Sequence, residues 1–438
     1  MRKVIYGLLV LGLVLILLPW WQTSWGLLST GQSLDWTLAL ARLAGLVAVY
    51  SLLLQVILIG RIGWIEKVFG LDRLIKWHHR NGFAAFWLIL AHPVLVIFSY
   101  AQLGRISFGQ QLLIFTRNDD LFQAVIAVAL FLAIIGLSLS MIRRYWRYEA
   151  WYLVHLGTYL AILLAFGHQT ELGGDFANST WFTIYWNTLY AFAFIHLVWF
   201  RFLRPAYLYQ KHAFRVERIE TETADSVSVY ISGKHLEQFK IAPGQIMILR
   251  FLAKGFWWQA HPFSLSAVPD GKSLRVTIKN LGDFTSQIKK LQPGTKLVID
   301  GPHGVFTPKA STNPKVLLIA GGVGITPIRS VTEALLAKGK QVVMLYANKT
   351  ENDIIFKAEL EQLQKPFNFP LYHVLSDEPN WQGEKGYLNQ EKLSRLVPDI
   401  KERDVYLCGP KPMMQAIRAI LAKLGVPKNN IFYESFVL

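Results

Sequence analysis

The sequence has almost no cysteine and comparatively little charge. Cys408 is the single cysteine among 438 residues, so one chain can build neither a disulfide framework nor a thiolate metal cluster. Charged residues make up 17% of the chain and hydrophobic residues 53%. This balance is too apolar for an ordinary soluble protein and too charged for a bundle buried entirely in lipid. We therefore expect one membrane part and one soluble part.

Acidic residues are also scarce. The chain has 29 Asp and Glu and 45 Lys and Arg, which gives a net charge of +16. The basic residues gather near the ends of apolar segments and are otherwise scattered. No RNP, zinc-finger or helix-turn-helix signature accompanies them, so nucleic-acid binding is not expected.

Six apolar segments occupy residues 1–205, each close to the roughly 20 residues that a helix needs to cross a bilayer. They lie at 4–20, 36–60, 80–101, 120–142, 150–168 and 181–202. The first follows Arg2 and Lys3, as a signal peptide would. No small-residue cleavage site follows, and Pro19-Trp-Trp21 indicates an interfacial anchor of a retained helix. The sequence predicts an all-α bundle of six membrane-spanning helices.

Basic residues alternate between rich and poor loops, and this alternation sets the orientation of the spans. The loops at 20–36 and 169–180 contain no Lys or Arg, and the loop at 102–119 contains only Arg105 and Arg117. The rich segments hold Arg2, Lys3, Arg61, Lys67, Arg73, Lys76, Arg143, Arg144, Arg147, Arg201, Arg204 and Lys211. We expect both termini, and everything after residue 205, on the cytoplasmic side of the plasma (inner) membrane.

The soluble part divides into two patterns. Short strands with turn signals at 214–221, 226–232, 245–251, 274–279 and 296–300 predict a small antiparallel β-barrel over 206–310. Strands at 316–320, 341–346, 372–375 and 405–407 then alternate with helices after Gly324 and near 355–364. This alternation predicts an α/β domain with a parallel sheet over 311–438.

A glycine turn follows the first strand of the α/β domain. Lys315–Pro327 has the order strand, glycines, helix, with Gly321, Gly322 and Gly324 at the turn. Glycines let a backbone approach a pyrophosphate closely, and the helix N-terminus offers aligned N–H donors. The strand-turn-helix context favours a dinucleotide site over a turn without a ligand.

Three other motifs complete a pattern: His261-Pro-Phe-Ser264, Gly282-Asp-Phe-Thr285 and Cys408-Gly-Pro410. With the glycine turn, in this order and at these separations, they resemble the ferredoxin-reductase family of flavoproteins over residues 212–438. In place of the family's Arg-x-Tyr-Ser, His261 and Phe263 remove one charge and one hydroxyl. The His-Pro-Phe-Ser form is similar to the NADPH oxidase and ferric reductase branch.

The resemblance implies roles for the matched residues. FAD would be held by His261, Pro262, Phe263, Ser264, Gly282 and Thr285. The nicotinamide nucleotide would lie against Gly321, Gly322, Gly324, Thr326, Pro327, Cys408, Gly409 and Pro410. Cys408 would lie at the reacting rings and Phe436 would stack on the isoalloxazine, although plain burial remains an alternative for both.

The choice between NADPH and NADH depends on the end of the second strand of the α/β domain. An acidic residue there would bind a ribose 2′-hydroxyl and repel a 2′-phosphate. Asn348 and Lys349 suit the phosphate instead, so NADPH is expected and NADH stays possible.

Histidines form two similarly spaced pairs in the membrane part. His78 and His92 are 14 residues apart on the third span, and His155 and His168 are 13 apart on the fifth. At 1.5 Å per residue each spacing is roughly 20 Å, most of a bilayer core of about 30 Å. Spans three and five run in the same direction, so His78 pairs with His155 and His92 with His168. Thirteen residues leave His168 off the face of His155 in an ideal helix, which requires a tilt, kink or bulge.

Two imidazoles per site, with no cysteine and no acid cluster, favour bis-histidine haem over zinc. These pairs in a six-span bundle resemble the ferric-reductase-like transmembrane domain of NADPH oxidases. The family's glycine falls four residues after its histidine, which matches His78 and Gly82; His79 remains an alternative ligand.

The resemblances together imply a transmembrane oxidoreductase. NADPH would reduce FAD, and two b-type haems would carry single electrons to a small external acceptor, oxygen (giving superoxide) or ferric iron. An alternative is a haem membrane anchor that donates electrons to an external partner protein. A channel or transporter with a nucleotide-sensing domain is a third possibility, which the paired histidines and flavin motifs disfavour.

Overall fold

The computed structural model describes residues 1–138, 145–146, 148–177 and 179–434. The chain divides into two compact units. Unit 1 comprises Met1–Ile62 and Arg73–Phe200, and unit 2 comprises Gly63–Asp72 and Arg201–Leu438.

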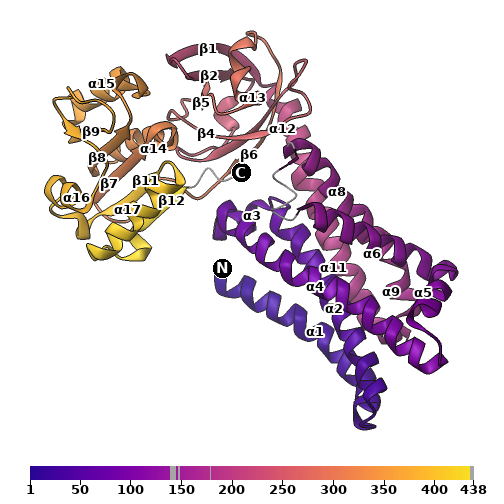
Figure 1. The fold of residues 1–438 in the computed structure, drawn as a ribbon. Helices are drawn as coiled ribbons and strands as arrows, with labels where there is room; N and C mark the ends of the chain where they lie inside the picture. Colours follow the sequence, from indigo (N-terminus) through magenta and orange to yellow (C-terminus); the bar gives the residue numbers. More distant parts are fainter. Residues whose placement is uncertain (139–144, 147, 178, 435–438) are drawn as a thin grey trace. The chain divides into compact units, whose positions relative to one another are not determined.

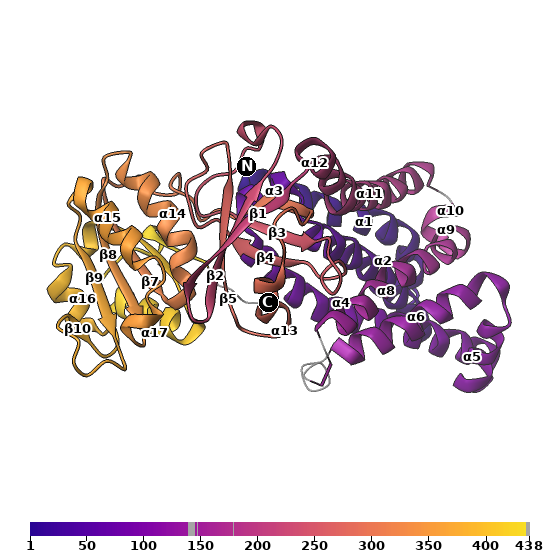
Figure 2. The same cartoon turned by 90° about the horizontal axis from the view of Figure 1, so that it is seen from above.

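Unit 1 is helical, and Figures 1 and 2 both show its long helices side by side. Its helices are α1 (Arg2–Ser29), α2 (Ser33–Ile59), α4 (Leu71–Gly104), α5 (Phe108–Thr116), α6 (Asp119–Ser138), α8 (Tyr148–Leu164), α9 (Gly167–Leu172), α10 (Gly174–Ala177) and α11 (Thr180–Val198). Five described segments are long and apolar enough to cross a membrane: α1, α2, α4, Leu121–Ser138 and Glu149–Leu172. The sixth predicted span corresponds to α11, which is not among them, so the count of six stays a prediction.

Two expectations for this unit need correction. The first helix continues through Pro19 to Ser29, and Trp20 donates from its indole nitrogen to the Ala39 carbonyl at 2.8 Å, so Trp20 ties α1 to α2. The predicted loop 102–119 contains helix α5, which Ser107 caps. The fifth span is interrupted, as the spacing of His155 and His168 required, because α8 ends at Leu164 and α9 begins at Gly167. The basic residues Arg143, Arg144 and Arg147 lie outside the described residues.

The first half of unit 2 contains two antiparallel three-stranded sheets, ordered β1-β2-β5 and β4-β3-β6. A π-helical turn (Trp199–Leu203) and α12 (Arg204–His212) precede them. The strands are β1 (Arg215–Thr223), β2 (Ser226–Ser232), β3 (Ile246–Phe251), β4 (His261–Ser264), β5 (Leu274–Lys279) and β6 (Leu297–His303). Bridges between Arg215 and Lys296 and between Leu265 and Val276 link the sheets around one shared apolar core. Barrel closure itself remains a prediction.

The second half of unit 2 is a parallel six-stranded sheet, ordered β10-β9-β8-β7-β11-β12. Its strands are β7 (Lys315–Gly321), β8 (Gln341–Asn348), β9 (Leu371–Leu375), β10 (Glu384–Lys385), β11 (Asp404–Cys408) and β12 (Ile431–Glu434). Helices α14 (Ile325–Leu336) and α15 (Lys357–Phe367) share one core with the sheet. Helices α16 (Gln390–Leu396) and α17 (Lys411–Lys423) share the other. Because both faces are covered, the central strands read as continuous apolar runs.

The short helix α3 (Gly63–Phe69) folds with unit 2, although it lies between two helices of unit 1 in sequence. Glu66 accepts a hydrogen bond from His303 Nδ1 at 2.7 Å and another from the Gly304 backbone nitrogen. The other His303 nitrogen, Nε2, lies 3.0 Å from Asp300. An imidazole donates from both nitrogens only when it is protonated, so this buried group is an ion triad, with Arg204 as a further positive charge near both carboxylates.

The triad predicts a loss of stability at alkaline pH. Burial lowers the pKa of His303, but the hydrogen bonds that its ring donates to Asp300 and Glu66, with the charges of these carboxylates, outweigh burial and raise the pKa overall. A raised folded-state pKa gives stability that is present below the unfolded value, about 6.5, and is lost as pH rises through the folded value. His303→Gln should cost about 3 kcal/mol or more, because it leaves buried carboxylates without their cation.

This effect is measured by thermal unfolding of the full chain between pH 6 and 10, with the release of flavin as the signal of unfolding. The loss of stability at alkaline pH should be smaller in His303→Gln than in wild type. The matched control is His235→Gln, because His235 is 61% exposed and 3.7 Å from Glu237. Equal pH profiles in wild type and His303→Gln would contradict the triad's role.

Candidate functional site

The membrane histidines form two pairs in unit 1. The ring centroids of His78 and His155 are 6.2 Å apart, and those of His92 and His168 are 6.4 Å apart. His78 and His92 both belong to α4, whereas His155 is on α8 and His168 on α9. The helix is interrupted at Ala165 and Phe166, between His155 and His168, where the 13-residue spacing required a tilt, kink or bulge.

The rings have the spacing of two imidazoles that share one metal ion. A metal–nitrogen bond of about 2 Å on each side, plus roughly 1 Å from each nitrogen to its ring centre, puts the centroids about 6 Å apart. Among the described residues, no group of three or more His, Cys, Asp or Glu gathers as a metal site. Each pair offers two imidazoles, which is the protein donor set of a bis-histidine haem.

Hydrogen bonds select the free nitrogen in one ring of each pair. His92 Nδ1 donates to the Ala41 carbonyl at 2.8 Å. His155 Nδ1 lies 3.3 Å from Ser138 Oγ, which also accepts from the indole of Trp151 at 3.0 Å. Such partners fix the tautomer and leave Nε2 of each ring free to bind a metal ion. Gly45 makes room for His92, because a Cβ there would lie 2.6 Å from the His92 ring.

The partner rings also fit a metal site. Nδ1 of His78 and Nδ1 of His168 are buried and make no well-aligned hydrogen bond, but each interacts with a backbone group, of Gln55 and of Ala165 respectively. These backbone groups are the kind of partner that orients a ring whose Nε2 binds a metal ion. His79, the alternative to His78, is exposed, whereas His78 is half-buried.

A buried polar cluster lies beside His168 that the sequence did not suggest. Gln169 donates to the Ala165 carbonyl at 2.5 Å and accepts from Trp186 and Tyr190, each at 3.0 Å. Nearby in sequence, Asp175 pairs with Arg42 of α2, and Thr23 of α1 donates to the same carboxylate. These contacts hold the segment that follows the helix break.

The flavin motifs lie on β4 and α13 (Asp283–Ser286) in unit 2. The ring of Phe284 packs 4.0 Å from His261 and 6.4 Å from Phe263, so the two motifs meet. Pro262 pairs with Ile248 inside the sheet. Ser264 Oγ is buried and has no partner among the described residues. Thr285 Oγ1 instead accepts from the Leu281 and Gly282 backbone nitrogens at 2.8 and 3.0 Å, so it orders the turn.

The glycine turn and the Cys408 turn are in direct contact, because β7 and β11 are neighbours. A Cβ on Gly324 would lie 2.3 Å from the Cys408 carbonyl oxygen, and a Cβ on Gly321 would lie 3.0 Å from Pro410. Gly322 has φ +51 and faces open space. The approach of the two turns thus demands glycine at 321 and 324, and Gly409 also meets Gly321 at 3.2 Å. Thr326 and Pro327 are buried at the start of α14.

Cys408 lies at the end of β11 and is fully buried. Burial, with the nearby Glu434 carboxyl, raises the pKa of the Cys408 thiol well above its usual range, so the thiol stays neutral. Glu434 pairs with Cys408 across β11 and β12, and its Oε2 is buried without a described partner. Burial also raises the pKa of Glu434 well above its usual range. The sequence did not lead us to Glu434. The signal that could have found it is an acidic residue at a position that faces inward in the last strand. Phe436 lies outside the described residues.

Asn348 is the last residue of β8, and Lys349 directly follows it. Asn348 is buried, and its side chain makes no well-aligned hydrogen bond although it interacts with Tyr346, whereas Lys349 is exposed. The neighbouring strand places Gly321 beside Ala347, so this end of β8 adjoins the glycine turn. His373 on β9 was also missed; both of its ring nitrogens are buried without a described partner.

Three family models match the chain in succession. They are the ferric reductase like transmembrane component over residues 44–166, an FAD-binding domain over 211–307, and the oxidoreductase NAD-binding domain over 318–419. In this order, the three models match the domain sequence expected of a ferric-reductase-like transmembrane flavoprotein. It is an oxidoreductase with a transmembrane reductase domain and with FAD- and NAD(P)-binding domains, and it is an integral membrane protein.

Curated relatives match part of the chain. The glycine betaine monooxygenase reductase subunit of Chromohalobacter salexigens is 32% identical over 238 residues, covering 52% of this chain and 64% of that protein. NADH-cytochrome b5 reductase 2 of Pyricularia oryzae is 37% identical over 172 residues, covering 34% of this chain and 52% of the relative. The chain thus spans between about half and two thirds of the length of these relatives.

Among solved structures, the FAD/NAD-binding domain of nitric oxide dioxygenase from Vibrio cholerae O1 biovar El Tor is 26% identical with a TM-score of 0.47. It covers 51% of this chain and 97% of its own.

Proposed function

We propose that the chain transfers electrons from cytosolic NADPH, through FAD and two bis-histidine haems, to oxygen on the other side of the membrane, giving superoxide. The observation that carries this proposal is the pair of imidazole contacts, 6.2 and 6.4 Å between ring centroids, at positions 14 residues apart on α4. FAD would convert a two-electron donor into single electrons, and the haems would carry those electrons across the bilayer.

The residues that would hold these groups follow from the site. His78 and His155 would bind one haem, and His92 and His168 the other. The remaining members of the proposed site serve the flavin and the nucleotide: His261, Pro262, Phe263, Ser264, Gly282, Thr285, Gly321, Gly322, Gly324, Thr326, Pro327, Asn348, Lys349, Cys408, Gly409, Pro410 and Phe436. In this proposal α11 is the sixth span, both termini are cytoplasmic, and the domains comprise residues 1–205, 206–310 and 311–438.

Two other acceptors belong to the same proposal as alternatives. Ferric iron could accept the electron, as the name of the transmembrane family model suggests. An external redox protein is the second alternative, because one relative is named as the reductase subunit of a larger enzyme.

Acceptor assays on the purified full chain in detergent test the proposal. Two low-spin haems per chain and NADPH-driven cytochrome c reduction that superoxide dismutase suppresses would support the oxidase. NADPH-driven reduction of a ferric chelate without oxygen, with little superoxide in air, would select the ferric reductase. Haems that reduce rapidly but do not turn over in air would indicate a partner protein. A preparation without haem would refute all three.

Lys349 should govern the choice of nucleotide. Lys349→Glu places a negative charge at the end of β8, where the 2′-phosphate of NADPH is expected. Because a hydrogen bond to a charged group contributes about 1.5–3 kcal/mol, we expect the KM for NADPH to rise roughly tenfold or more. The KM for NADH should change little.

Steady-state kinetics with both nucleotides measure this shift. Lys338→Glu is the matched control, because it makes the same charge change just before β8 begins. An equal rise in KM for NADPH and NADH in Lys349→Glu would contradict the assignment.

A further inference from the structure

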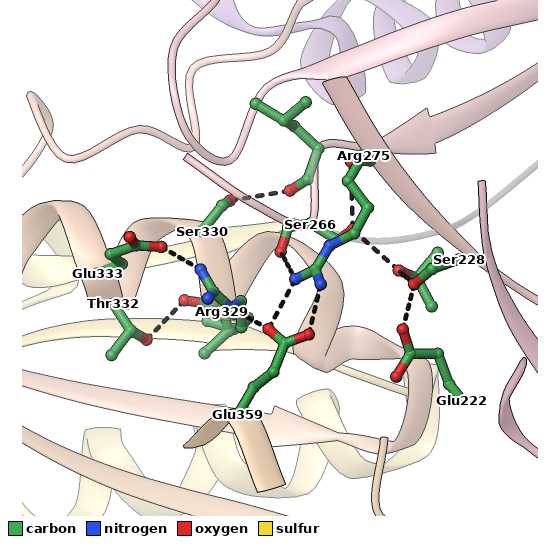
Figure 3. A network of polar contacts seen from close by, with 12 residues as sticks. Glu222, Ser228, Ser266, Arg275, Arg329, Ser330, Thr332, Glu333 and Glu359 are labelled. Atoms are coloured by element: carbon green, nitrogen blue, oxygen red, sulfur yellow. Dashed lines mark hydrogen bonds and ion pairs between the residues drawn. The ribbon is translucent and has the colours of Figure 1, made fainter. Parts of the chain in front are cut away.

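Three charged side chains join the two halves of unit 2, and we call them the interdomain clamp: Arg275 of β5, Arg329 of α14 and Glu359 of α15. Arg275 Nη1 lies 2.5 Å from Glu359 Oε1, and Arg275 Nη2 lies 3.0 Å from Oε2. Arg329 Nε donates to the same Oε2 at 3.0 Å. Figure 3 shows the Glu359 carboxylate between the two guanidinium groups, which come from opposite halves.

The clamp also reaches the chain segment that continues the flavin strand. Arg275 Nη2 donates to the Ser266 carbonyl at 2.9 Å, and Ser330 Oγ of α14 donates to the Leu265 carbonyl at 2.8 Å. Leu265 and Ser266 directly follow Ser264 of β4. Helix α14 begins at Ile325, directly after the glycine turn. The clamp therefore ties the backbone of the flavin motif to the helix that follows the nucleotide motif.

The members of the clamp are desolvated enough for its geometry to be well defined. The side chains of Arg275 and Arg329 are 5% and 13% exposed, and that of Glu359 is 32% exposed. Burial alone would raise the pKa of Glu359, but the hydrogen bond and charge of Arg275, with the charge of Arg329, lower it overall. The carboxylate is therefore charged at neutral pH and holds both arginines.

An open groove of about 530 Å³ lies beside the clamp. Arg218, Tyr230 and Arg275 line it from the flavin half, and Arg329, Glu359 and Leu363 line it from the nucleotide half. All three members of the clamp thus line this space, together with residues from both halves.

We propose that the interdomain clamp sets the distance and angle at which the nicotinamide approaches the flavin, which makes Arg275, Arg329 and Glu359 positioning residues. The inference rests on the proposed function, in that a pyridine nucleotide reduces a bound flavin. Reacting atoms must meet within about 3–3.5 Å, and an error of about 1 Å can cost roughly 100-fold in rate. None of the three residues belongs to the flavin or nucleotide motifs.

Glu359→Gln tests the clamp with little change of shape. The amide keeps the size of the side chain but removes the charge that both guanidinium groups share. Glu361→Gln is the matched control, because Glu361 is an exposed acid on the same helix. Both variants are prepared as the full chain with FAD bound.

Two measurements separate positioning from folding. Stopped-flow bleaching of flavin absorbance by NADPH without oxygen gives a limiting rate and a half-saturating concentration. Titration of the reduced protein with NADP⁺ gives the long-wavelength charge-transfer absorbance of a stacked nicotinamide–flavin pair. We expect Glu359→Gln to lower the limiting rate roughly 10- to 100-fold and to weaken the charge-transfer band. Half-saturation should change less than twofold, and Glu361→Gln should match wild type.

An unchanged limiting rate and band in Glu359→Gln would overturn the inference, as would a rise in half-saturation alone. If Glu359→Gln does not retain FAD, Arg329→Lys is measured by the same criteria, because lysine keeps the charge and loses the Nε–H donor. Wild-type flavin that neither NADPH nor NADH bleaches would refute the proposed function, and the clamp's role with it. Bleaching that is normal in wild type and in both variants would refute the clamp alone.

Discussion

Substitution of His92 by leucine is expected to remove one of two haems and to leave reduction of the flavin by NADPH intact. His92 and His168 face each other at 6.4 Å between ring centroids, and a leucine would leave one imidazole in that pair. The flavin and nucleotide motifs lie wholly in unit 2, so their chemistry should not depend on this ring. Electrons would then leave the flavin but not reach the external acceptor, and acceptor reduction should fall to background.

Three measurements test this result. The pyridine haemochrome assay gives the haem content, absorbance spectra give the low-spin haem bands, and anaerobic bleaching gives the rate of flavin reduction. His196→Leu is the matched control, because His196 lies on α11, where its Nδ1 contacts the Phe192 carbonyl of its own helix at 2.8 Å. The control should keep two haems. If His92→Leu also keeps both, the pairing of the histidines is wrong.

Sequence spacing could predict the pairs and the need for a bend in the fifth span, but not where the bend lies. The intervals of 14 and 13 residues follow from the chain itself, and parallel spans make His78 meet His155. The break after Leu164 depends on Gln169, Trp186 and Tyr190, which meet only in the folded bundle. Trp186 and Tyr190 lie 17 and 21 residues from Gln169 in the sequence, so no local pattern near the break indicates that they contact it.

The soluble part shows the same division between local and distant information. Glycine turns and strand patterns are local, so they placed β7, α14 and β11 nearly as the structure has them. Glu66 and His303 are 237 residues apart, and Arg275 and Glu359 are 84 apart. Such pairs join elements that the fold brings together, and charge patterns along a single sequence do not identify them. Helix α3 was accordingly predicted as part of a loop.

Gln169→Leu should destabilise the segment that carries His168 and change the outer haem. The substitution removes the acceptor of Trp186 and Tyr190, which are 0% and 7% exposed, and the donor to the Ala165 carbonyl at the break. Each buried group left without a partner costs about 1–3 kcal/mol, so the Trp186 and Tyr190 donors alone should cost roughly 2–6 kcal/mol. Gln111→Leu is the matched control, because Gln111 is a glutamine of α5 that is only 6% exposed.

Replacing Trp186 and Tyr190, the donors that Gln169→Leu leaves without an acceptor, separates the loss of stability from a change in the position of His168. Removing both partners of a buried hydrogen bond can be nearly neutral, so Gln169→Leu combined with Trp186→Phe and Tyr190→Phe should recover much of the thermal stability. The contact from Gln169 to Ala165 stays absent in that triple variant. Its outer haem should therefore keep an altered midpoint potential and altered electron paramagnetic resonance g-values, while the His78–His155 haem stays unchanged. Wild-type values for both haems in Gln169→Leu would show that the break holds His168 without Gln169.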